Sequence, residues 1–161
     1  MAEKFAVNAS PLIFLAQAGL LDLLRLVNDT GVVPGAVLRE IEAGAHIHDT
    51  AQVVRQTDWL TVVKGEGIPE SIQIWDLGEG ESAVLAWALS HPGADAVVDD
   101  LQARRCAATL GLPVRGTLGL VIAARQRGKI PAARPVIERL MEAGMYLSDA
   151  VVNLALRKIG E

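Results

Sequence analysis

Short apolar runs alternate with helix-forming stretches along the whole chain, and this alternation restricts the fold more than any other feature. The runs have the length and composition of buried strands and lie at residues 5–8, 31–33, 59–63, 94–98 and 112–116. Stretches whose apolar residues recur at helical spacing lie between them. Strands that alternate with helices predict right-handed crossovers and a parallel sheet. We therefore expect an α/β fold, a three-layer α/β/α sandwich with a central parallel sheet whose first strand is central.

The helices that connect these strands have recognisable ends. Ser10, Thr117 and Ser148 are good N-cap residues, and Pro11 suits a first helical position. Glycines that follow a helical pattern predict its end, and they are Gly19, Gly111 and Gly128. The expected helices cover 11–19, 20–27, a segment from Pro34, 79–90, 101–110, 117–128, 135–144 and 148–160. Residues 46–56 are interpreted as a polar helix or loop, and 64–71 as a loop.

Length and composition suit one domain that spans residues 1–161. A chain of 161 residues buries about 70% of the surface that its unfolded form exposes. Hydrophobic residues make up 51% of the chain and charged residues 21%, which favours a sheet covered on both faces. Aromatic residues make up only 4%, too few for a surface that stacks single-stranded bases.

The single cysteine and the N-terminus bear on the compartment. Cys106 lies on an apolar helical face and is interpreted as a small buried hydrophobe. One cysteine cannot form an internal disulfide, which fits a reducing cytoplasm. The first ten residues have no signal-peptide pattern, and no apolar run is long enough to span a bilayer. We therefore expect a cytoplasmic protein without a membrane partner.

Carboxylates occur where apolar strands give way to helices. Glu40, Glu81 and the pair Asp99 and Asp100 occupy such junctions, and Asn8 occupies a fourth junction of the same kind. Because the carboxyl ends of parallel strands share one edge of the sheet, these side chains are expected to converge. Clustered carboxylates repel one another unless a cation is present. The pattern therefore suggests a Mg²⁺ or Mn²⁺ site.

Each of these acids also has a purely structural interpretation. Glu79 and Glu81 lie in the first turn of a helix, where acids complement the helix dipole. Glu40 taken alone would be a surface helix acid. Asp99 and Asp100 are adjacent, and a helix cap requires only one of them, which favours a functional role for at least one.

Other motifs do not indicate a function. His46 and His48 form an H-x-H pair, but no third ligand completes a zinc set, and we interpret both as exposed. The glycines of DLGEGE are not followed by the Lys-Ser/Thr of a phosphate-binding loop. Ser10 has no evident histidine partner for nucleophilic catalysis.

Charge is distributed unevenly along the chain. Residues 1–100 carry 5 Lys or Arg and 15 Asp or Glu, whereas residues 101–161 carry 10 and 4. In a single domain this asymmetry suggests one face that holds metal and another that holds phosphates. The alternative is an ordinary soluble surface with uneven charge.

The order of four motifs resembles the PIN-domain superfamily. The motifs are FAVNASPLIFLAQAGLLDLL, VPGAVLREI, LGEGESAVLAWAL and VVDDLQARRCAATLGLPVRGTLGLVIAARQRGKI. The resemblance extends over nearly the whole chain and is closest to a branch of small prokaryotic PIN-like proteins. It implies a metal-dependent ribonuclease. The superfamily includes the toxins of toxin–antitoxin pairs, which are commonly dimers.

The resemblance also implies a set of site residues. The first acid of the family falls on Asn8, the second on Glu40, the third on Glu81 and the fourth on Asp100, with Asp99 as an accessory ligand. The family's usual first acid is aspartate. Because the amide of Asn8 can coordinate a metal but brings no charge, Mg²⁺ should bind more weakly. Glu81 replaces the more common aspartate with a longer side chain.

Two hypotheses follow. The first is an endoribonuclease in which Mg²⁺ or Mn²⁺ is held by these residues, Glu40, Glu81 and Asp100 are catalytic, and Arg104, Arg105 and Arg115 bind flanking phosphates of the RNA. The second is a PIN-fold module that binds nucleic acid or a partner and has lost catalysis through Asn8. A receiver or phosphohydrolase domain fits less well, because the first strand offers no aspartyl nucleophile. As a toxin, the protein would bind an antitoxin. We also expect a homodimer built on the helices at 20–27 and 79–90.

Overall fold

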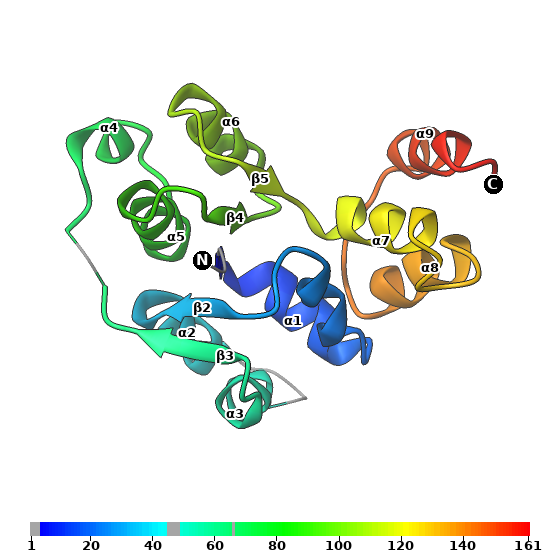
Figure 1. The fold of residues 1–161 in the computed structure, drawn as a ribbon, viewed down its shortest axis with the longest axis horizontal. Helices are drawn as coiled ribbons and strands as arrows, with labels where there is room; N and C mark the ends of the chain where they lie inside the picture. The colour runs from blue at the N-terminus through cyan, green and yellow to red at the C-terminus, as the bar shows by residue number, and fades with distance from the viewer. Residues whose placement is uncertain (1–3, 45–48, 66) are drawn as a thin grey trace.

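A parallel sheet of five strands forms the centre of the protein. The computed structural model describes residues 4–44, 49–65 and 67–161 (Figure 1). The strands run in the order β3-β2-β1-β4-β5, and every neighbouring pair is parallel. They are β1 Phe5–Val7, β2 Gly31–Pro34, β3 Leu60–Val63, β4 Asp95–Val97 and β5 Val114–Arg115. The predicted α/β sandwich with a central parallel sheet is thus confirmed, and its first strand is central as expected.

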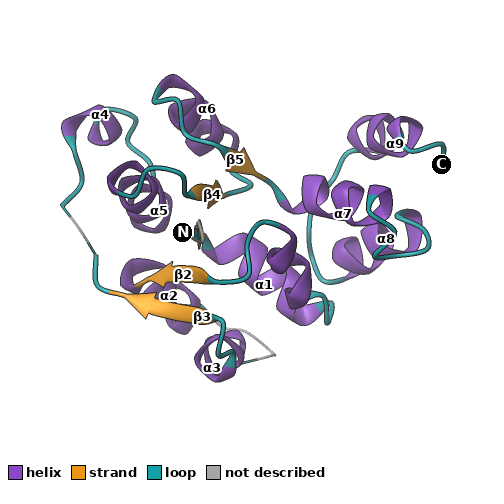
Figure 2. Cartoon of the chain, viewed as in Figure 1, coloured by secondary structure: helices purple, strands orange, loops and turns teal. Residues whose placement is uncertain are grey.

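Helices flank this sheet (Figure 2). They are α1 Ala9–Gln17, the 3₁₀ helix η1 Leu21–Leu26, α2 Gly35–Ala43, α3 Thr50–Gln56, α4 Glu70–Gln73, α5 Glu79–Ser90, α6 Leu101–Thr109, α7 Thr117–Gln126, α8 Arg134–Glu142 and α9 Asp149–Lys158. Helix α5 packs against β1, β2 and β4, and it also contacts α2. Helices α7, α8 and α9 gather at the end of the molecule opposite α4 (Figure 1).

Most of the predicted helices are present, with corrections at their ends. Ser148 caps α9 as expected, because its hydroxyl accepts a hydrogen bond from the N–H of Val151. Asn8, rather than Ser10, is the N-cap of α1. The N-cap of α7 is Gly116, and Thr117 begins that helix. The predicted helix ends at Gly19, Gly111 and Gly128 are present, since each of these glycines follows a helix and has a positive φ.

Two segments differ from expectation. The leucine-rich segment at 20–27 forms a 3₁₀ helix, since its apolar spacing does not distinguish a tight helix from an α-helix. The predicted loop at 64–71 ends earlier than expected, because α4 begins at Glu70. Helix α3 covers the second part of the segment at 46–56. His46 and His48 lie outside the described residues.

The central strand β1 is fully buried, and Asn8 follows directly after it. Phe5, Ala6 and Val7 have no exposed surface. The ring of Phe5 lies against Gly31 of β2, where an added Cβ would approach ring carbon atoms to 2.3 Å. Only glycine fits at that position of β2. The close approach sets the packing of β1 against β2, and the chain leaves β1 at Asn8.

The core accounts for Cys106 and for the segments predicted to form a dimer surface. Cys106 is fully buried and free, and burial raises the pKa of its thiol, in agreement with its interpretation as a small hydrophobe. Helix α5 is buried over Gly80 and over 82–88, and Leu23 and Leu24 of η1 are buried too. The prediction that η1 and α5 present free apolar faces is therefore wrong. Among the described residues, no helix has both the length and the apolar character needed to cross a membrane.

Candidate active site

Asn8 ends the central strand with a buried amide that has an unused oxygen. Its backbone N–H donates to the carbonyl of Val97 at 3.0 Å, so the residue continues the pairing of β1 with β4. The side chain is 2% exposed, and its Oδ1 atom has no hydrogen-bond partner among the described residues. An unpaired buried oxygen costs about 1–3 kcal/mol. A buried polar atom without a protein partner calls for an explanation, and a bound cation is one that suits an amide oxygen.

Glu40 brings a second oxygen to the same place. A Cβ added to Gly80, in the first turn of α5, would lie 2.9 Å from Asn8 Oδ1 and 3.3 Å from Glu40 Oε2. The two oxygens therefore face the backbone of Gly80 from β1 and from α2. Because Gly80 has no side chain, both oxygens come closer to its backbone than a side chain there would allow. We call this arrangement of Asn8, Glu40 and Gly80 the oxygen cradle.

Two further acids surround the cradle. Burial raises the pKa of the Glu40 carboxyl above its usual value, and the negative charges of Glu81 and then Glu79 raise it further. Glu81 Oε2 would lie 2.6 Å from a Cβ added to Gly78, so this carboxylate folds back over the residue that caps α5. Glu40 and Glu81 thus lie close enough for their charges to interact.

Both carboxylate oxygens of Asp99 accept hydrogen bonds from Thr117. Oδ1 accepts the N–H of Thr117 at 2.7 Å, and Oδ2 accepts its hydroxyl at 2.7 Å. Thr117 has no exposed surface. Arg104 donates to the carbonyl of Val98 at 3.2 Å, immediately before this aspartate. Asp99 therefore ties the end of β4 to the beginning of α7.

Asp100 has a different role from its neighbour. One oxygen, Oδ2, accepts the N–H of Ala103 at 2.9 Å and caps α6. The residue is exposed, and its other carboxylate oxygen has no hydrogen-bond partner among the described residues. Of the two adjacent acids, Asp100 is the one that keeps an oxygen free for a ligand.

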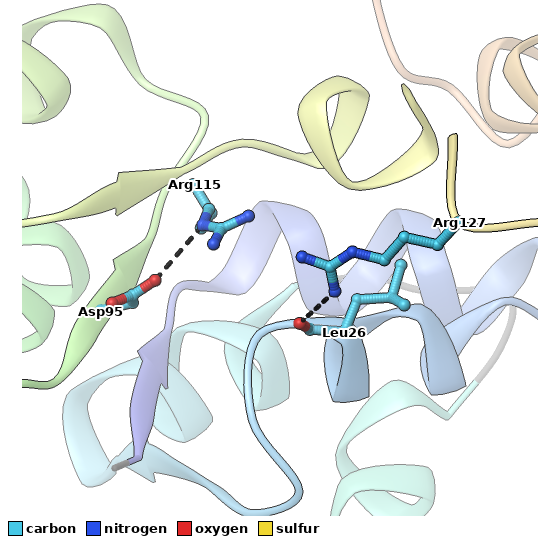
Figure 3. Close-up of polar contacts among 4 residues, drawn as sticks. All are labelled: Leu26, Asp95, Arg115 and Arg127. Carbon is cyan, nitrogen blue, oxygen red and sulfur yellow. Dashed lines mark hydrogen bonds and ion pairs between the residues drawn. The ribbon is translucent and has the colours of Figure 1, made fainter. Parts of the chain in front are cut away.

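The predicted phosphate-binding arginines are not equivalent. Nε of Arg115 donates to Asp95 Oδ2 at 3.3 Å, and this ion pair joins β5 to β4 (Figure 3). Arg104 is half-buried and engaged with a backbone carbonyl. Arg105 is exposed, and its guanidinium pairs with no other described residue. Arg105 is therefore the most available of the three. Arg127 of the same basic region fixes α7 to η1, since it donates to the carbonyl of Leu26 (Figure 3).

The acids come together only in part. Within the described part of the chain, no group of three or more His, Cys, Asp or Glu side chains is arranged to hold a metal ion. The donors that do converge are the amide oxygen of Asn8 and the carboxylate of Glu40, with Glu81 close enough to shift the pKa of Glu40. These are hard oxygen donors of the kind that Mg²⁺ and Mn²⁺ prefer. The cradle fits such an ion by its chemistry.

Gly80 and Thr117 are parts of the site that the sequence analysis did not identify. Gly80 had one signal in the sequence, because a glycine in the first turn of a helix is unfavourable there unless space is needed. Thr117 had none, since its partner Asp99 is 18 residues away and lies just after β4.

Comparison with known proteins agrees with this architecture. A family model described as a PIN domain matches residues 4–161. A comparison with curated proteins found no match. PIN domains have a nuclease-type fold, they bind nucleic acid, and they typically depend on divalent metal ions. Because the matched region covers nearly the whole chain, including the oxygen cradle and the acids around it, the chain belongs to the PIN-domain family.

Proposed function

We propose that the protein is a metal-dependent endoribonuclease that hydrolyses phosphodiester bonds of RNA. The observation that carries the proposal is the oxygen cradle, in which the unpaired oxygen of Asn8 and a carboxylate oxygen of Glu40 both lie close to the backbone of Gly80. Placing a buried, unpaired amide oxygen beside a carboxylate destabilises the fold unless a cation is bound. The function therefore explains a feature that packing alone does not.

In this proposal each residue has a defined part. Asn8 and Glu40 would hold Mg²⁺ or Mn²⁺ in the oxygen cradle, and Glu81 and the free oxygen of Asp100 would have to move towards the ion to join them, because the described acids do not form a three-acid metal site. A bound divalent ion lowers the pKa of a water molecule and offsets negative charge on the phosphate. Asp99 positions the end of β4 through Thr117, because both of its oxygens are engaged there.

The RNA itself would be held by the basic part of the chain. Arg105 is free to contact a flanking phosphate, whereas Arg104 and Arg115 would have to exchange their present partners. A buried free cysteine is compatible with a reducing compartment, and we place the reaction in the cytoplasm.

The nuclease hypothesis is tested by RNA hydrolysis with and without chelator. We expect the full chain to cleave a single-stranded RNA in Mn²⁺ or Mg²⁺ and to lose this activity in EDTA. Glu40→Gln serves as the inactive comparison, since it removes a ligand charge without changing the shape of the side chain. Equal cleavage by wild type and Glu40→Gln would mean that a contaminating nuclease or another site is responsible.

The second hypothesis, a binding module with weakened catalysis, is favoured by Asn8. This residue supplies an oxygen but no charge at the position of the first acid, so the site holds a cation less strongly than four carboxylates would. RNA binding that survives in EDTA, without cleavage in any divalent ion, would favour this second function.

Gly80→Ala should close the oxygen cradle. The new methyl group would lie 2.9 Å from Asn8 Oδ1 and 3.3 Å from Glu40 Oε2, in the space proposed for the ion. We expect Mn²⁺ affinity, measured by calorimetry, to fall at least about tenfold, which corresponds to about 1.4 kcal/mol. Stability in EDTA should change little, because the gain of about 0.5–1 kcal/mol in helix propensity offsets the close contact.

Gly119→Ala is the matched control for this change. Gly119 lies in α7, and a Cβ added there meets nothing within 4 Å. The control should gain stability and leave Mn²⁺ affinity unchanged. If Gly80→Ala binds Mn²⁺ as tightly as wild type, the ion does not occupy the cradle.

We also propose a homodimer, on a surface other than the one expected from sequence. Large apolar side chains stand exposed on α9 and just before it, with Tyr146 88%, Leu154 57% and Val151 45% exposed. Val151 and Leu154 are one helical turn apart and lie on the same side of α9. Contiguous exposed apolar patches commonly mark an interface, and we propose that these side chains form one.

Light scattering tests the dimer. Wild type should have twice the monomer mass at roughly tens of micromolar, and Leu154→Glu should shift the protein towards the monomer. Val53→Glu, on an exposed apolar residue of α3, is the control. A monomeric wild type would refute the dimer.

Co-purification with the product of an adjacent small gene would support the further proposal that the protein is a toxin bound by an antitoxin.

A further inference from the structure

A cavity of about 440 Å³ opens beside the oxygen cradle. Two of its lining residues lie one helical turn from cradle residues and share a helix face with them. Ala36 is four residues before Glu40 on α2, and Ala83 is three residues after Gly80 on α5. The cavity thus shares α2 and α5 with two of the three cradle residues, and these helices pack against each other. Its volume lies within the range of small-molecule sites, about 300–1,000 Å³.

The lining combines apolar walls with polar groups. Ala36, Ile68, Leu77 and Ala83 supply apolar surface. Polar atoms come from α2, from α5 and from the segment between α4 and α5, and the residues are Arg39, Gln73, Asp76, Glu79 and Ser82. A flat ring with hydrogen-bonding edges matches such a lining, since its faces require apolar contact and its edges require donors and acceptors.

Several of these polar groups have no partner in the protein. Ser82 is 9% exposed, and its hydroxyl forms no hydrogen bond with another described residue. The same holds for the carboxylate of Asp76, whose backbone has a positive φ of 51°. Arg39 forms no ion pair with a described residue. Gln73 donates its amide to the carbonyl of Ile68 at 2.7 Å, which leaves its side-chain oxygen available.

The charges in the cavity select the part of a nucleic acid that can enter. The lining carries two carboxylates, those of Asp76 and Glu79, and one guanidinium, that of Arg39, so its net charge is negative. A phosphate group would be repelled by this lining. A neutral base would not be repelled, and its N–H groups could donate to a carboxylate.

We propose that this cavity binds one unpaired nucleobase of the RNA, next to the phosphodiester at the oxygen cradle, and that guanine is the base it fits best. Guanine presents two acceptors, O6 and N7, which match the guanidinium of Arg39. It also carries N–H donors, which match the carboxylate of Asp76. Single-stranded RNA is commonly recognised through splayed bases read at their edges. This inference rests on the proposed function, because it names the part of the substrate that the neighbouring site receives.

The test measures binding rather than cleavage. Fluorescence anisotropy would compare three labelled oligouridylates that carry guanosine, adenosine or an abasic nucleotide at one central position, in buffer with Ca²⁺ in place of Mg²⁺. We expect the guanosine RNA to bind about tenfold more tightly than the abasic RNA, which is within the range of one bidentate contact to a base edge. The adenosine RNA should bind with intermediate affinity.

Two cavity variants and one control complete the experiment. Asp76→Asn changes an exposed acceptor and should remove the preference for guanosine over adenosine. Ser82→Leu fills the cavity and should remove the preference over the abasic RNA. Ala108→Leu, on an exposed position of α6, should behave as wild type. If Ser82→Leu fails to fold, Asp76→Asn decides alone.

The outcomes separate this inference from the proposed function. Equal binding of all three RNAs by wild type would overturn the base subsite, as would a guanosine preference that persists unchanged in Asp76→Asn. If the guanosine preference depends on Asp76 but the same RNA is not cleaved in Mg²⁺ or Mn²⁺, the base subsite stands and the nuclease function fails.

Discussion

Asp99→Ala is expected to destabilise the fold by about 2–4 kcal/mol, although the side chain is only half-buried. Its carboxylate accepts two hydrogen bonds from Thr117 at 2.7 Å each, and Thr117 is completely buried. Hydrogen bonds to a charged group contribute about 1.5–3 kcal/mol each and are not additive. The loss leaves a buried N–H and a buried hydroxyl without their partner. Urea denaturation measures the change in the free energy of unfolding.

The adjacent acid provides the matched control. Asp100→Ala removes a single cap hydrogen bond at an exposed position and should cost only about 1 kcal/mol. Its main effect should be on Mn²⁺ affinity, since Asp100 keeps the oxygen that we assign to the ion. The two variants should therefore affect different properties. Asp99→Ala should mainly lower the stability of the fold, and Asp100→Ala should mainly weaken Mn²⁺ binding.

Thr117→Val identifies the partner. It removes the hydroxyl but keeps the backbone N–H, so it should reproduce part of the loss, and the double variant should lose less than the sum of the two single changes. A fully additive pair would show that Asp99 stabilises the fold through something other than Thr117.

The pair of aspartates also illustrates how far the sequence could lead. The alternation of apolar runs and helical patterns was enough to predict the parallel sheet, because both periodicities are local. The same local reasoning indicated that one of the two acids would cap a helix. It could not tell which one, because the partner of Asp99 comes from α7 and is brought close by the pairing of β4 with β5.

The oxygen cradle depends on contacts of the same non-local kind. The junction positions of Asn8 and Glu40 predicted that they would lie at one edge of the sheet. Their approach to Gly80 follows from the packing of α2 against α5, which no local pattern encodes. Burial was also misjudged for α5, which was expected to offer a free face and is instead covered over most of its length.

Asn8→Asp is expected to have opposite effects with and without metal. In EDTA the change places a carboxylate where the side chain is 2% exposed, without a hydrogen-bond donor at Oδ1 and beside Glu40. Burial and the neighbouring charge both disfavour the ionised form. We expect a loss of about 2–4 kcal/mol at neutral pH and a lower Tm, since each unit of pKa shift corresponds to about 1.4 kcal/mol.

The pH dependence of this loss has a definite sign. The new carboxyl should have a higher pKa in the folded protein than in the unfolded chain. Between these two values the folded state binds more protons, so the stability of the variant relative to wild type should rise as the pH falls. Thermal melts of both proteins in EDTA, from neutral to mildly acidic pH, measure this difference.

With Mn²⁺ or Mg²⁺ the sign should reverse. The added charge turns a neutral ligand into an anionic one in the oxygen cradle, so calorimetry should give at least about tenfold tighter binding. If the first proposed function is right, RNA cleavage should be faster as well. Asn153→Asp, on an exposed position of α9, controls for the change in net charge and should alter neither property. A packing defect would lower Tm in both conditions. An unchanged metal affinity would therefore exclude Asn8 from the metal site, even if the fold were destabilised as expected.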